Sequence, residues 1–582
     1  MLEQRYRWKN KQLREHVHVI DGKKAPTLVL ENTVYLNQVF RKWMKANIWI
    51  YEDRIVYVGE KMPDMLDGTE IVDCTGQYLV PGYIEPHAHP FQLYNPETLC
   101  THAGQFGTTT LINDNMLLFT LLENRQAFAL LKELRQLPVS MYWWARLDSQ
   151  TELRNEEMVF SHSNVKNWLE HDGVLQAGEL TGWPRLLDGD DMMLHWIQEA
   201  KRMRKKIEGH FPGASEKTLA KLALLGADCD HEAMTGKEVI RRLMQGYDVS
   251  LRHSSIRPDL PRILEELKEY ELNSYDRLFF NTDGSTPGFY KDGFTDQLIS
   301  IAIEKGVPII DAYNMASYNI ARYYNMDYLH GNIATGRIAN INFLSAKDKP
   351  TPHSVLSKGQ WLKKDGNTVP MDPSLSIAWE DFNLSPLNLD WDLTEYDFQY
   401  SMPFGINMEN SVITKPYSIH IDISREVLDE DHDECYFTFL TRDGKFRINT
   451  LLKGFAKRLH GFASSFSNSG DILLIGKSKK DMKLAFERMK EIGGGIVIAE
   501  RGQILFEMPL QLQGLMSNQE LPLLIEAEAK LRELLIEKGY PFEDPVYSLL
   551  FFSSTHLPYI RVTQAGLYDV MNKSVLFPTI MR

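Results

Sequence analysis

Six histidine and carboxylate side chains stand where short apolar runs of the sequence end. They are His87, His89, Glu179, His210, His231 and Asp283. Imidazole and carboxylate groups together suit zinc, manganese or iron better than magnesium or calcium. Two such ions, bridged by the two oxygens of Glu179, would lower the pKa of water between them and supply hydroxide at neutral pH. The set therefore predicts a hydrolytic site that holds two divalent metal ions.

The His-x-His pair is a weak signal when it is considered alone. His87 and His89 could simply be two histidines with ordinary hydrogen-bond partners. However, residues i and i+2 of a strand point to the same face, so both imidazoles can face one site. Because the other members of the set also end strand-like runs, a shared cation explains all of them together.

The elements that must position this set alternate between strands and helices. Eight strand-like runs are separated by helix-length segments. The runs are YLVPGYIEPHAHP, GTTTLINDN, PVSMYWWARLD, GVLQAGEL, KKIEGHF, GADCDHE, YDVSLRHSS and YDRLFFNTDG. This pattern predicts an α/β fold with a (β/α)8 TIM-like barrel. The six side chains would then meet at the carboxyl ends of the strands, which is where barrel enzymes place their active sites.

Helix-start signals support the alternation of strands and helices. Thr235 and Glu238 form a T-x-x-E capping box, and Gly246 is placed to end the same helix. Ser215 is a good N-cap for the segment SEKTLAKLALLG. Both helices fall between predicted strands, as the barrel requires.

The chain of 582 residues is long enough for several domains. We expect the first part of a small β-domain in residues 1–75, the barrel in 76–335 and the second part of the β-domain in 336–370. The β-domain is therefore predicted to be a discontinuous β-sandwich, and NIWIYEDRIVYVGE within it has the pattern of a hairpin. A linker is expected in 371–410 and an α+β domain in 411–582.

Composition excludes several classes of protein. The net charge is −14, which disfavours a surface for nucleic acid or anionic membranes. The N-terminus lacks the apolar segment of a signal peptide, and no apolar run is long enough to span a membrane. The four cysteines are scattered without a CxxC pair, which indicates reduced thiols and a cytoplasmic protein.

Several motifs resemble a known family. VPGYIEPHAHP is similar to the amidohydrolase signature VPGxIDxHxH. GELTGWPRLLDGD, EGHFPGAS, ADCDHEAMTGKEV and NTDG resemble the adenine deaminase branch of that superfamily. The C-terminal segments SFSNSGDILLIGKSKKDMKLAFERMKEIGGGIVI and MPLQLQGLMS are also similar to that branch. The resemblance covers most of the chain from about residue 75.

The resemblance implies an activity and roles for particular residues. It implies hydrolysis of adenine to hypoxanthine and ammonia by a hydroxide that bridges two ions of manganese or iron, with zinc as a further candidate. It also implies that Asp283 activates the water, and Glu232 is a candidate for passing a proton to the purine. A simpler role for Glu232 is a carboxylate at a helix start. The expected partner is a purine base, and a homo-oligomer is left open.

Three further residues are candidates for substrate binding. Arg252 and Ser254 in LRHSS could contact the substrate, although an ion pair at the rim explains the arginine equally well. Trp144, beside Trp143 in the third strand, could stack on a flat heterocycle. Because adjacent strand residues face opposite sides, at least one of these tryptophans is expected to pack in the core.

The sequence departs from the family at positions that could lie in the pocket. The family has Asp-Pro-His-Glu where this chain has Asp114-Asn115-Met116-Leu117, and Arg-Glu-Gly-Ser where this chain has Arg252-His253-Ser254-Ser255. The family run His-Asp-Ser-His is replaced by Ser467-Asn468-Ser469-Gly470. These changes leave another aminated heterocycle or a cyclic amide as an alternative substrate. A non-catalytic metal-binding protein is a further alternative, which the retention of all six ligands and Glu232 disfavours.

Overall fold

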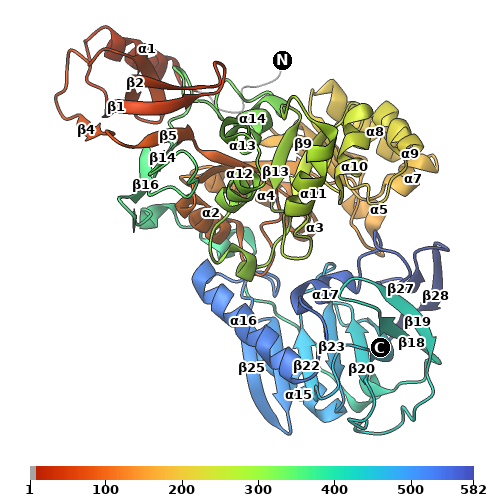
Figure 1. Ribbon diagram of the computed structural model, residues 1–582. Coiled ribbons are helices and arrows are strands. Elements are labelled where there is room, and N and C mark those ends of the chain that lie inside the picture. Colours follow the sequence, from red (N-terminus) through yellow and green to blue (C-terminus); the bar gives the residue numbers. More distant parts are fainter. Residues whose placement is uncertain (1–7) are drawn as a thin grey trace.

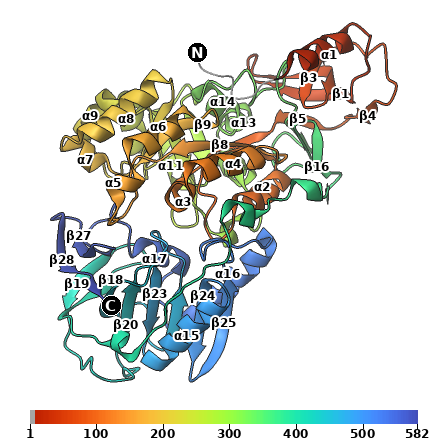
Figure 2. The same cartoon turned by 180° about the vertical axis from the view of Figure 1, so that it is seen from behind.

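The computed structural model describes residues 8–582, so residues 1–7 of the predicted N-terminal segment lie outside the described residues. A small β-sheet stands at one end of the molecule, a layer of parallel strands covered by helices forms the middle, and the C-terminal unit stands at the other end (Figure 1). The reverse view shows the same order (Figure 2). No helix among residues 8–582 has the length and apolar character needed to cross a membrane.

The middle layer contains the predicted barrel. Its eight strands pair in parallel in chain order, and the last strand contacts the first, so the ring is nearly closed. The strands are β6 (Tyr83–Ala88), β7 (Thr108–Asn113), β8 (Ser140–Ala145), β9 (Val174–Leu180), β10 (Lys206–Gly209), β11 (Cys229–Asp230), β12 (Asp248–Arg252) and β13 (Leu278–Asn281). Each strand falls within one of the eight predicted runs, so the barrel prediction is confirmed.

A buried carboxylate joins the two strands at which the ring closes. Glu85 of β6 accepts hydrogen bonds from the amide (3.0 Å) and hydroxyl (2.9 Å) of Thr282, which follows β13. Its other oxygen accepts from the amide of His87 at 2.9 Å. Burial raises the pKa of Glu85 to about 8. The first histidine of the predicted set is thus held where the barrel closes.

The helices that follow the strands cover the outside of the barrel (Figure 1). They are α2 (Pro96–Gln105), α3 (Met116–Leu121), α4 (Asn124–Leu134), α5 (Glu156–Val159), α6 (His162–Glu170), α7 (Trp183–Leu187), α8 (Asp191–Arg202), α9 (Glu216–Leu225), α10 (Gly236–Met244), α11 (Leu260–Leu267), α12 (Thr295–Glu304), α13 (Ile309–Met315) and α14 (Tyr318–Tyr323). The Thr235 hydroxyl accepts from the amide of Glu238 at the start of α10, and Ser215 caps α9 in the same way. Both predicted N-caps are therefore confirmed.

The small sheet is built from two separate segments of the chain. It has nine strands: β1 (Leu28–Asn37), β2 (Lys42–Tyr51), β3 (Arg54–Gly59), β4 (Glu70–Asp73), β5 (Tyr78–Pro81), β14 (Ile341–Leu344), β15 (Ser354–Ser357), β16 (Gln360–Lys364) and β17 (Asn367–Thr368). Antiparallel pairing of β5 with β14 joins the two segments. The β2–β3 pair is the hairpin expected in this region, and helix α1 (Asn10–Ile20) contacts β3.

The C-terminal unit contains a second nine-stranded sheet and a three-stranded sheet. The large sheet comprises β18 (Phe404–Met408), β19 (Thr414–Ser418), β20 (Glu434–Leu440), β21 (Phe446–Lys453), β22 (Gly461–Ser464), β23 (Ile472–Gly476), β24 (Gly495–Glu500), β25 (Gln503–Pro509) and β29 (Ile580–Met581). The three-stranded sheet of the C-terminal unit comprises β26 (Ile560–Val562), β27 (Gly566–Asp569) and β28 (Ser574–Pro578). The helices are α15 (Lys479–Glu491), α16 (Leu521–Glu537) and α17 (Pro545–Phe551). The large sheet begins with β18, which precedes residue 411.

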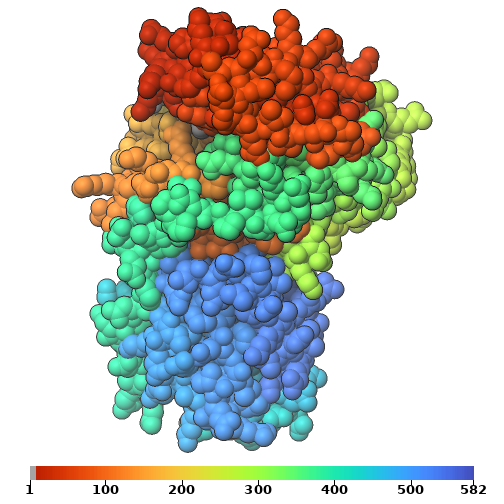
Figure 3. Space-filling model, turned by 90° about the vertical axis from the view of Figure 1, so that its left-hand side faces the viewer, coloured from red at the N-terminus to blue at the C-terminus, as the bar shows by residue number. Residues whose placement is uncertain are grey.

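The segment 371–403 runs from β17 of the N-terminal sheet to the C-terminal unit, and it packs against both the barrel and the C-terminal unit. Trp379 and Leu384 are buried in the apolar core of the barrel, whereas Leu389 and Leu393 are buried in the core of the C-terminal unit. In the space-filling view the green to teal surface that includes this segment lies between the N-terminal part and the blue C-terminal part (Figure 3). We call this segment the strap.

Candidate metal centre

A cavity of about 550 Å³ lies between the carboxyl ends of the barrel strands and the C-terminal unit. Barrel residues that line it include His89, Glu179, His210 and Asp283, which belong to the predicted set. His87 and His231 are fully buried beside them. The topology therefore brings all six predicted metal ligands to one place.

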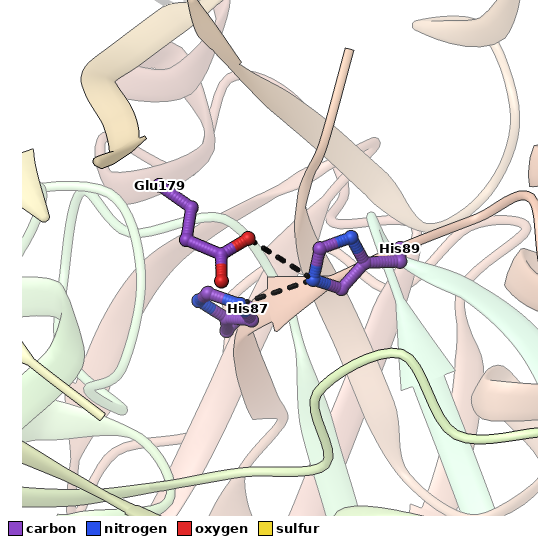
Figure 4. Close-up of side chains that lie close together, drawn as sticks. All are labelled: His87, His89 and Glu179. Atoms are coloured by element: carbon purple, nitrogen blue, oxygen red, sulfur yellow. Dashed lines mark hydrogen bonds and ion pairs between the residues drawn. The ribbon is translucent and has the colours of Figure 1, made fainter. Parts of the chain in front are cut away.

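The first group of ligand atoms is formed by His87, His89, Glu179 and Asp283. The Nε2 atoms of the two histidines lie 3.1 Å apart. Asp283 Oδ1 lies 3.1 Å from His89 Nε2 and 3.6 Å from His87 Nε2. Glu179 Oε2 lies 3.8 Å from His89 Nε2. Figure 4 shows His87, His89 and Glu179, with dashed lines that mark the contacts of His89 with the other two. One ligand atom from each of His87, His89 and Glu179 lies within 4.8 Å of the other two.

The second group is formed by Glu179, His210 and His231. The nitrogens His210 Nδ1 and His231 Nε2 lie 3.2 Å apart. Glu179 Oε1 lies 2.5 Å from the first nitrogen and 3.4 Å from the second. Glu179 thus turns one oxygen towards each group, as a carboxylate that bridges two ions would.

The donor atoms fit a divalent metal ion. The Nδ1 atoms of His87 and His89 face carboxylates, at 2.8 Å from Glu208 and 2.9 Å from Asp114. When both Nδ1 atoms carry the proton, both Nε2 atoms present lone pairs to each other at 3.1 Å. That arrangement is repulsive unless a cation lies between them. Two nitrogens that bind one ion at about 2.1 Å come to a similar separation.

The charges around the first group favour a cation. Burial alone would lower the pKa of His89, but hydrogen bonds from this ring to Asp114 and Asp283 raise it to about 10. An environment that stabilises an added proton also stabilises a metal ion. Arg146 offsets part of the negative charge by donating to Asp114 (2.7 Å) and to Glu179 Oε2 (2.9 Å).

The two predicted proton-transfer residues are held by arginines. Arg252 Nη1 lies 2.5 Å from Asp283 Oδ2 and 2.6 Å from Glu232 Oε1. A second arginine, Arg257, donates to Glu232 Oε2 at 2.5 Å. Burial would raise the pKa of both carboxyl groups, but the arginines and the nearby histidines keep both well below their ordinary values. Arg252 is therefore engaged in ion pairs, and it also lines the cavity, so its position is compatible with both of its predicted roles.

The other two predicted substrate contacts lie behind the residues that line the cavity. Ser254 is fully buried, and its hydroxyl accepts from the amide of Arg257 at 3.3 Å. Trp144 is also fully buried, and its ring packs against His87 with centroids 4.3 Å apart. Trp143 is buried in the barrel core. These positions give Ser254 and Trp144 contacts that support the site.

Residues from two of the three departures from the family pattern line the cavity. Met116 and Leu117 stand on one side of it, and Ser467 and Asn468 stand on the side formed by the C-terminal unit. Compared with the family motifs named above, the cavity is therefore less polar beside Met116 and Leu117. It also lacks a charged group beside Ser467 and Asn468.

Sequence reasoning missed several residues of the site. Asp114 and Arg146 also follow barrel strands, and Glu208 stands two residues before His210 on the same strand face, so their positions could have identified them. His556 and Tyr547 of the C-terminal unit line the cavity far from the barrel in sequence, and no local pattern identifies them.

Three hydrogen bonds connect the C-terminal unit to the metal centre through one barrel residue. Gln150 follows β8, has a left-handed φ of 59°, and donates from its side chain to Glu179 Oε2 at 3.2 Å. Its carbonyl accepts from the amide of Thr555 at 2.8 Å and from the side chain of Asn468 at 3.4 Å. The C-terminal unit thus fixes a residue that contacts Glu179.

The chain matches two families of known proteins. Residues 78–362 match the amidohydrolase family, and residues 411–574 match the adenine deaminase C-terminal domain. Among solved structures, β-aspartyl dipeptidase from Fervidobacterium islandicum AW-1 is 18% identical, with a TM-score of 0.46 over 60% of this chain and 99% of that chain.

Relatives are similar over the whole length. A protein of Bacillus cereus named "Putative adenine deaminase" is 59% identical over 99% of this chain and 97% of its own length. "Putative adenine deaminase YerA" of Bacillus subtilis is 55% identical over 100% of both chains. "Adenine deaminase" of Kosmotoga olearia is 28% identical over 96% of this chain and 97% of its own length. The chain therefore belongs to the adenine deaminase family of the amidohydrolases, metal-dependent hydrolases that act on C–N bonds.

Proposed function

We propose that the protein hydrolyses adenine to hypoxanthine and ammonia at a centre of two divalent metal ions. The observation that carries the proposal is the position of Glu179, whose Oε1 faces nitrogens of His210 and His231 while its Oε2 faces the Nε2 atom of His89. The relatives named as adenine deaminases support the choice of substrate. Imidazole and carboxylate ligands support manganese or iron, with zinc as a further candidate.

The proposed ligands divide between the two groups. His87, His89 and Asp283 would hold one ion, His210 and His231 would hold the other, and Glu179 would bind both. Bound ions of this kind lower the pKa of water and thus supply a nucleophile at neutral pH.

We assign proton transfer to Asp283. It lies at the cavity wall, and Arg252 holds its Oδ2 while Oδ1 faces the histidines. A carboxylate in this place can accept the proton of the attacking water and pass it towards the departing amine. Glu232 also lines the cavity, and two arginines hold it as a carboxylate. This favours Glu232 as a hydrogen-bond acceptor for a ring N–H, because a carboxylate with a lowered pKa is a weak proton acceptor.

The C-terminal unit is proposed to close the substrate pocket. Phe466, Tyr547 and His556 line the side opposite the barrel. Enclosure of a small heterocycle excludes bulk water and strengthens electrostatic interactions within the site.

The proposal also places the protein in the cytoplasm, which is supported by four buried, unpaired cysteines.

A second candidate is the same chemistry on another aminated heterocycle or on a cyclic amide. Met116 and Leu117 favour it, because the family motif has a histidine and a glutamate where this chain presents apolar side chains to the cavity. Such a change would weaken recognition of a polar edge of adenine, since apolar groups cannot replace its hydrogen-bond partners.

The test is turnover of a panel by the manganese-loaded protein. Adenine, other aminated purines and pyrimidines, and cyclic amides are supplied separately, and the ultraviolet spectrum of each compound and the release of ammonia from each aminated base are followed. We expect chelation to abolish turnover and manganese to restore it. Turnover of adenine supports the first proposal, turnover of another member alone supports the second, and no turnover by protein containing two metals per chain contradicts both.

A further inference from the structure

One carboxylate behind the metal centre touches both ligand groups. Glu208 lies in β10, two residues before His210, so both side chains point to the inside of the barrel. Its side chain is buried, and it is not one of the residues that line the cavity. It is the first residue of the EGHFPGAS motif that contains His210, but it was not among the predicted metal ligands.

A single oxygen of Glu208 contacts one histidine from each group. Oε1 shares a hydrogen bond of 2.8 Å with Nδ1 of His87 and lies 3.3 Å from Nδ1 of His231, an ion-pair contact without hydrogen-bond alignment. The two imidazole rings lie side by side, with centroids 4.1 Å apart. In both rings Nε2 points away from Glu208 and towards the metal-binding groups. A proton on each Nδ1 would leave each Nε2 free to bind an ion.

The other oxygen of Glu208 is fixed from the barrel interior. Gln176 Nε2 donates to Glu208 Oε2 at 2.6 Å, and Gln176 Oε1 accepts from the hydroxyl of Tyr324 at 2.6 Å. Tyr324 is buried at the end of α14. This chain of hydrogen bonds restricts rotation of the carboxylate and keeps Oε1 between the two histidines.

We propose that Glu208 is a positioning residue shared by the two metal-binding groups, which sets the orientation and tautomer of His87 and His231 together. The inference rests on the proposed function in requiring two ions. Carboxylates that accept from a ligating histidine orient the ring and increase its basicity. Because one oxygen serves both rings, loss of Glu208 releases a ligand from each group at once. Asp114 differs from Glu208, because its contact with a proposed histidine ligand is with His89, which belongs to the first group.

The test compares metal binding by two variants of Glu208 with binding by the wild type. Metal-free protein is titrated with manganese by calorimetry, and electron paramagnetic resonance distinguishes a spin-coupled pair from isolated ions. We expect Glu208→Gln to weaken both binding steps by roughly 10-fold and Glu208→Met by roughly 100-fold, the range seen for such partners. The coupled signal should decrease in parallel with the loss of affinity.

A buried carboxylate outside the site provides a matched control. Asp296 is buried in α12 and bonds to the amide of Phe294 and the hydroxyl of Thr351. Asp296→Asn should leave both manganese steps unchanged. Gln176→Leu, which keeps Glu208 but frees its second oxygen, should weaken both steps less than Glu208→Gln. Circular dichroism of the metal-free proteins checks that each variant is folded. If Glu208→Met does not fold, the comparison with the wild type rests on Glu208→Gln.

The outcomes separate this inference from the proposed function. Two ions in the wild type and weakening of both steps in folded Glu208→Gln support the shared role. Two ions in the wild type and loss of affinity at one step only, or at neither, overturn the role of Glu208 and leave the proposed function standing. A wild type that binds fewer than two ions overturns the proposed function, and this inference with it.

Discussion

At the scale of single residues, the proposed chemistry depends on two carboxylates with different tasks. Glu179 faces both groups of histidines, whereas Asp283 faces one group and is also paired with Arg252. Asp283 has a left-handed backbone with φ of 51°, which aspartate tolerates better than most residues. This turn just after β13 suits a side chain that must contact both a metal ion and a substrate.

Replacement of Asp283 by asparagine should separate metal binding from catalysis. Asparagine keeps the shape and one oxygen ligand but cannot accept the proton of water. We expect Asp283→Asn to retain most of its metal and to lose about 10²–10⁴ in kcat, the usual contribution of general acid–base catalysis. Metal analysis and steady-state kinetics check this. Near-normal turnover at full metal content would move the role to Glu232.

Replacement of Glu179 should affect both properties together. Without the bridging carboxylate each group loses one ligand and the two ions lose their common anion, so Glu179→Ala should lower metal content and turnover in proportion. Glu157, which is exposed on α5, provides the control Glu157→Ala with unchanged metal content. A fully loaded and active Glu179→Ala protein would show that Glu179 has a structural role alone.

At the scale of elements, the strap is held to the C-terminal unit by a buried carboxylate. Asp397 accepts hydrogen bonds from Arg447 (2.7 Å) and from Arg582, the last residue of the chain (2.7 and 2.8 Å). Burial would raise the pKa of Asp397, but the bonds from Arg582 and from the amide of Thr394 lower it below its ordinary value. The strap and the chain end therefore stabilise each other through this group.

Removal of this charge should destabilise the C-terminal unit in a pH-dependent way. We expect Asp397→Asn to cost roughly 1.5–3 kcal/mol at neutral pH, as for hydrogen bonds to a charged group. Because the folded pKa is lowered, the stabilisation is complete above the unfolded pKa of about 3.9, decreases as the pH falls below it, and is lost completely only as the pH falls through the folded pKa. Thermal unfolding of both proteins between pH 7 and pH 2.5 measures this. A difference that persists unchanged at pH 2.5, or an equal loss in the exposed control Asp390→Asn, would contradict the assignment.

At the scale of the whole molecule, the active site is shared between the barrel and the C-terminal unit. The C-terminal unit supplies one wall of the cavity and holds Gln150 against the bridging Glu179. His556 stands on that wall with its ring in an edge contact with His210, at 5.2 Å between centroids. Its Nδ1 is buried and has no hydrogen-bond partner within residues 8–582. Such an atom is placed to bind a substrate.

Truncation of His556 should impair substrate binding without affecting the metal ions. One hydrogen bond contributes about 0.5–1.5 kcal/mol, so His556→Ala should raise KM by roughly 2–10-fold while manganese stoichiometry is unchanged. The exposed His432 of the same unit provides the control His432→Ala, which should alter neither quantity. Loss of metal from His556→Ala, or an unchanged KM, would show that the wall does not contact substrate through this residue.

The barrel and the six proposed ligands could be predicted from local patterns in the chain. Strand and helix periodicity are local properties, so the eight runs could be located, and residues at their ends had to meet at one rim. The same rule could have identified Asp114 and Arg146, which also follow strands. The family motifs added the C-terminal unit, whose sheet begins slightly earlier, at β18, than residue 411.

Only the tertiary structure decided which side chains contact one another. The sequence predicted that Arg252, Ser254 and Trp144 lie near the site. It did not predict the ion pairs of Arg252 or the burial of Ser254 and Trp144. It also could not show that Glu208 serves two histidines, or that His556 closes the cavity from another unit. Such contacts join residues far apart in the chain, and they depend on packing angles and on the docking of whole units, which local sequence patterns do not encode.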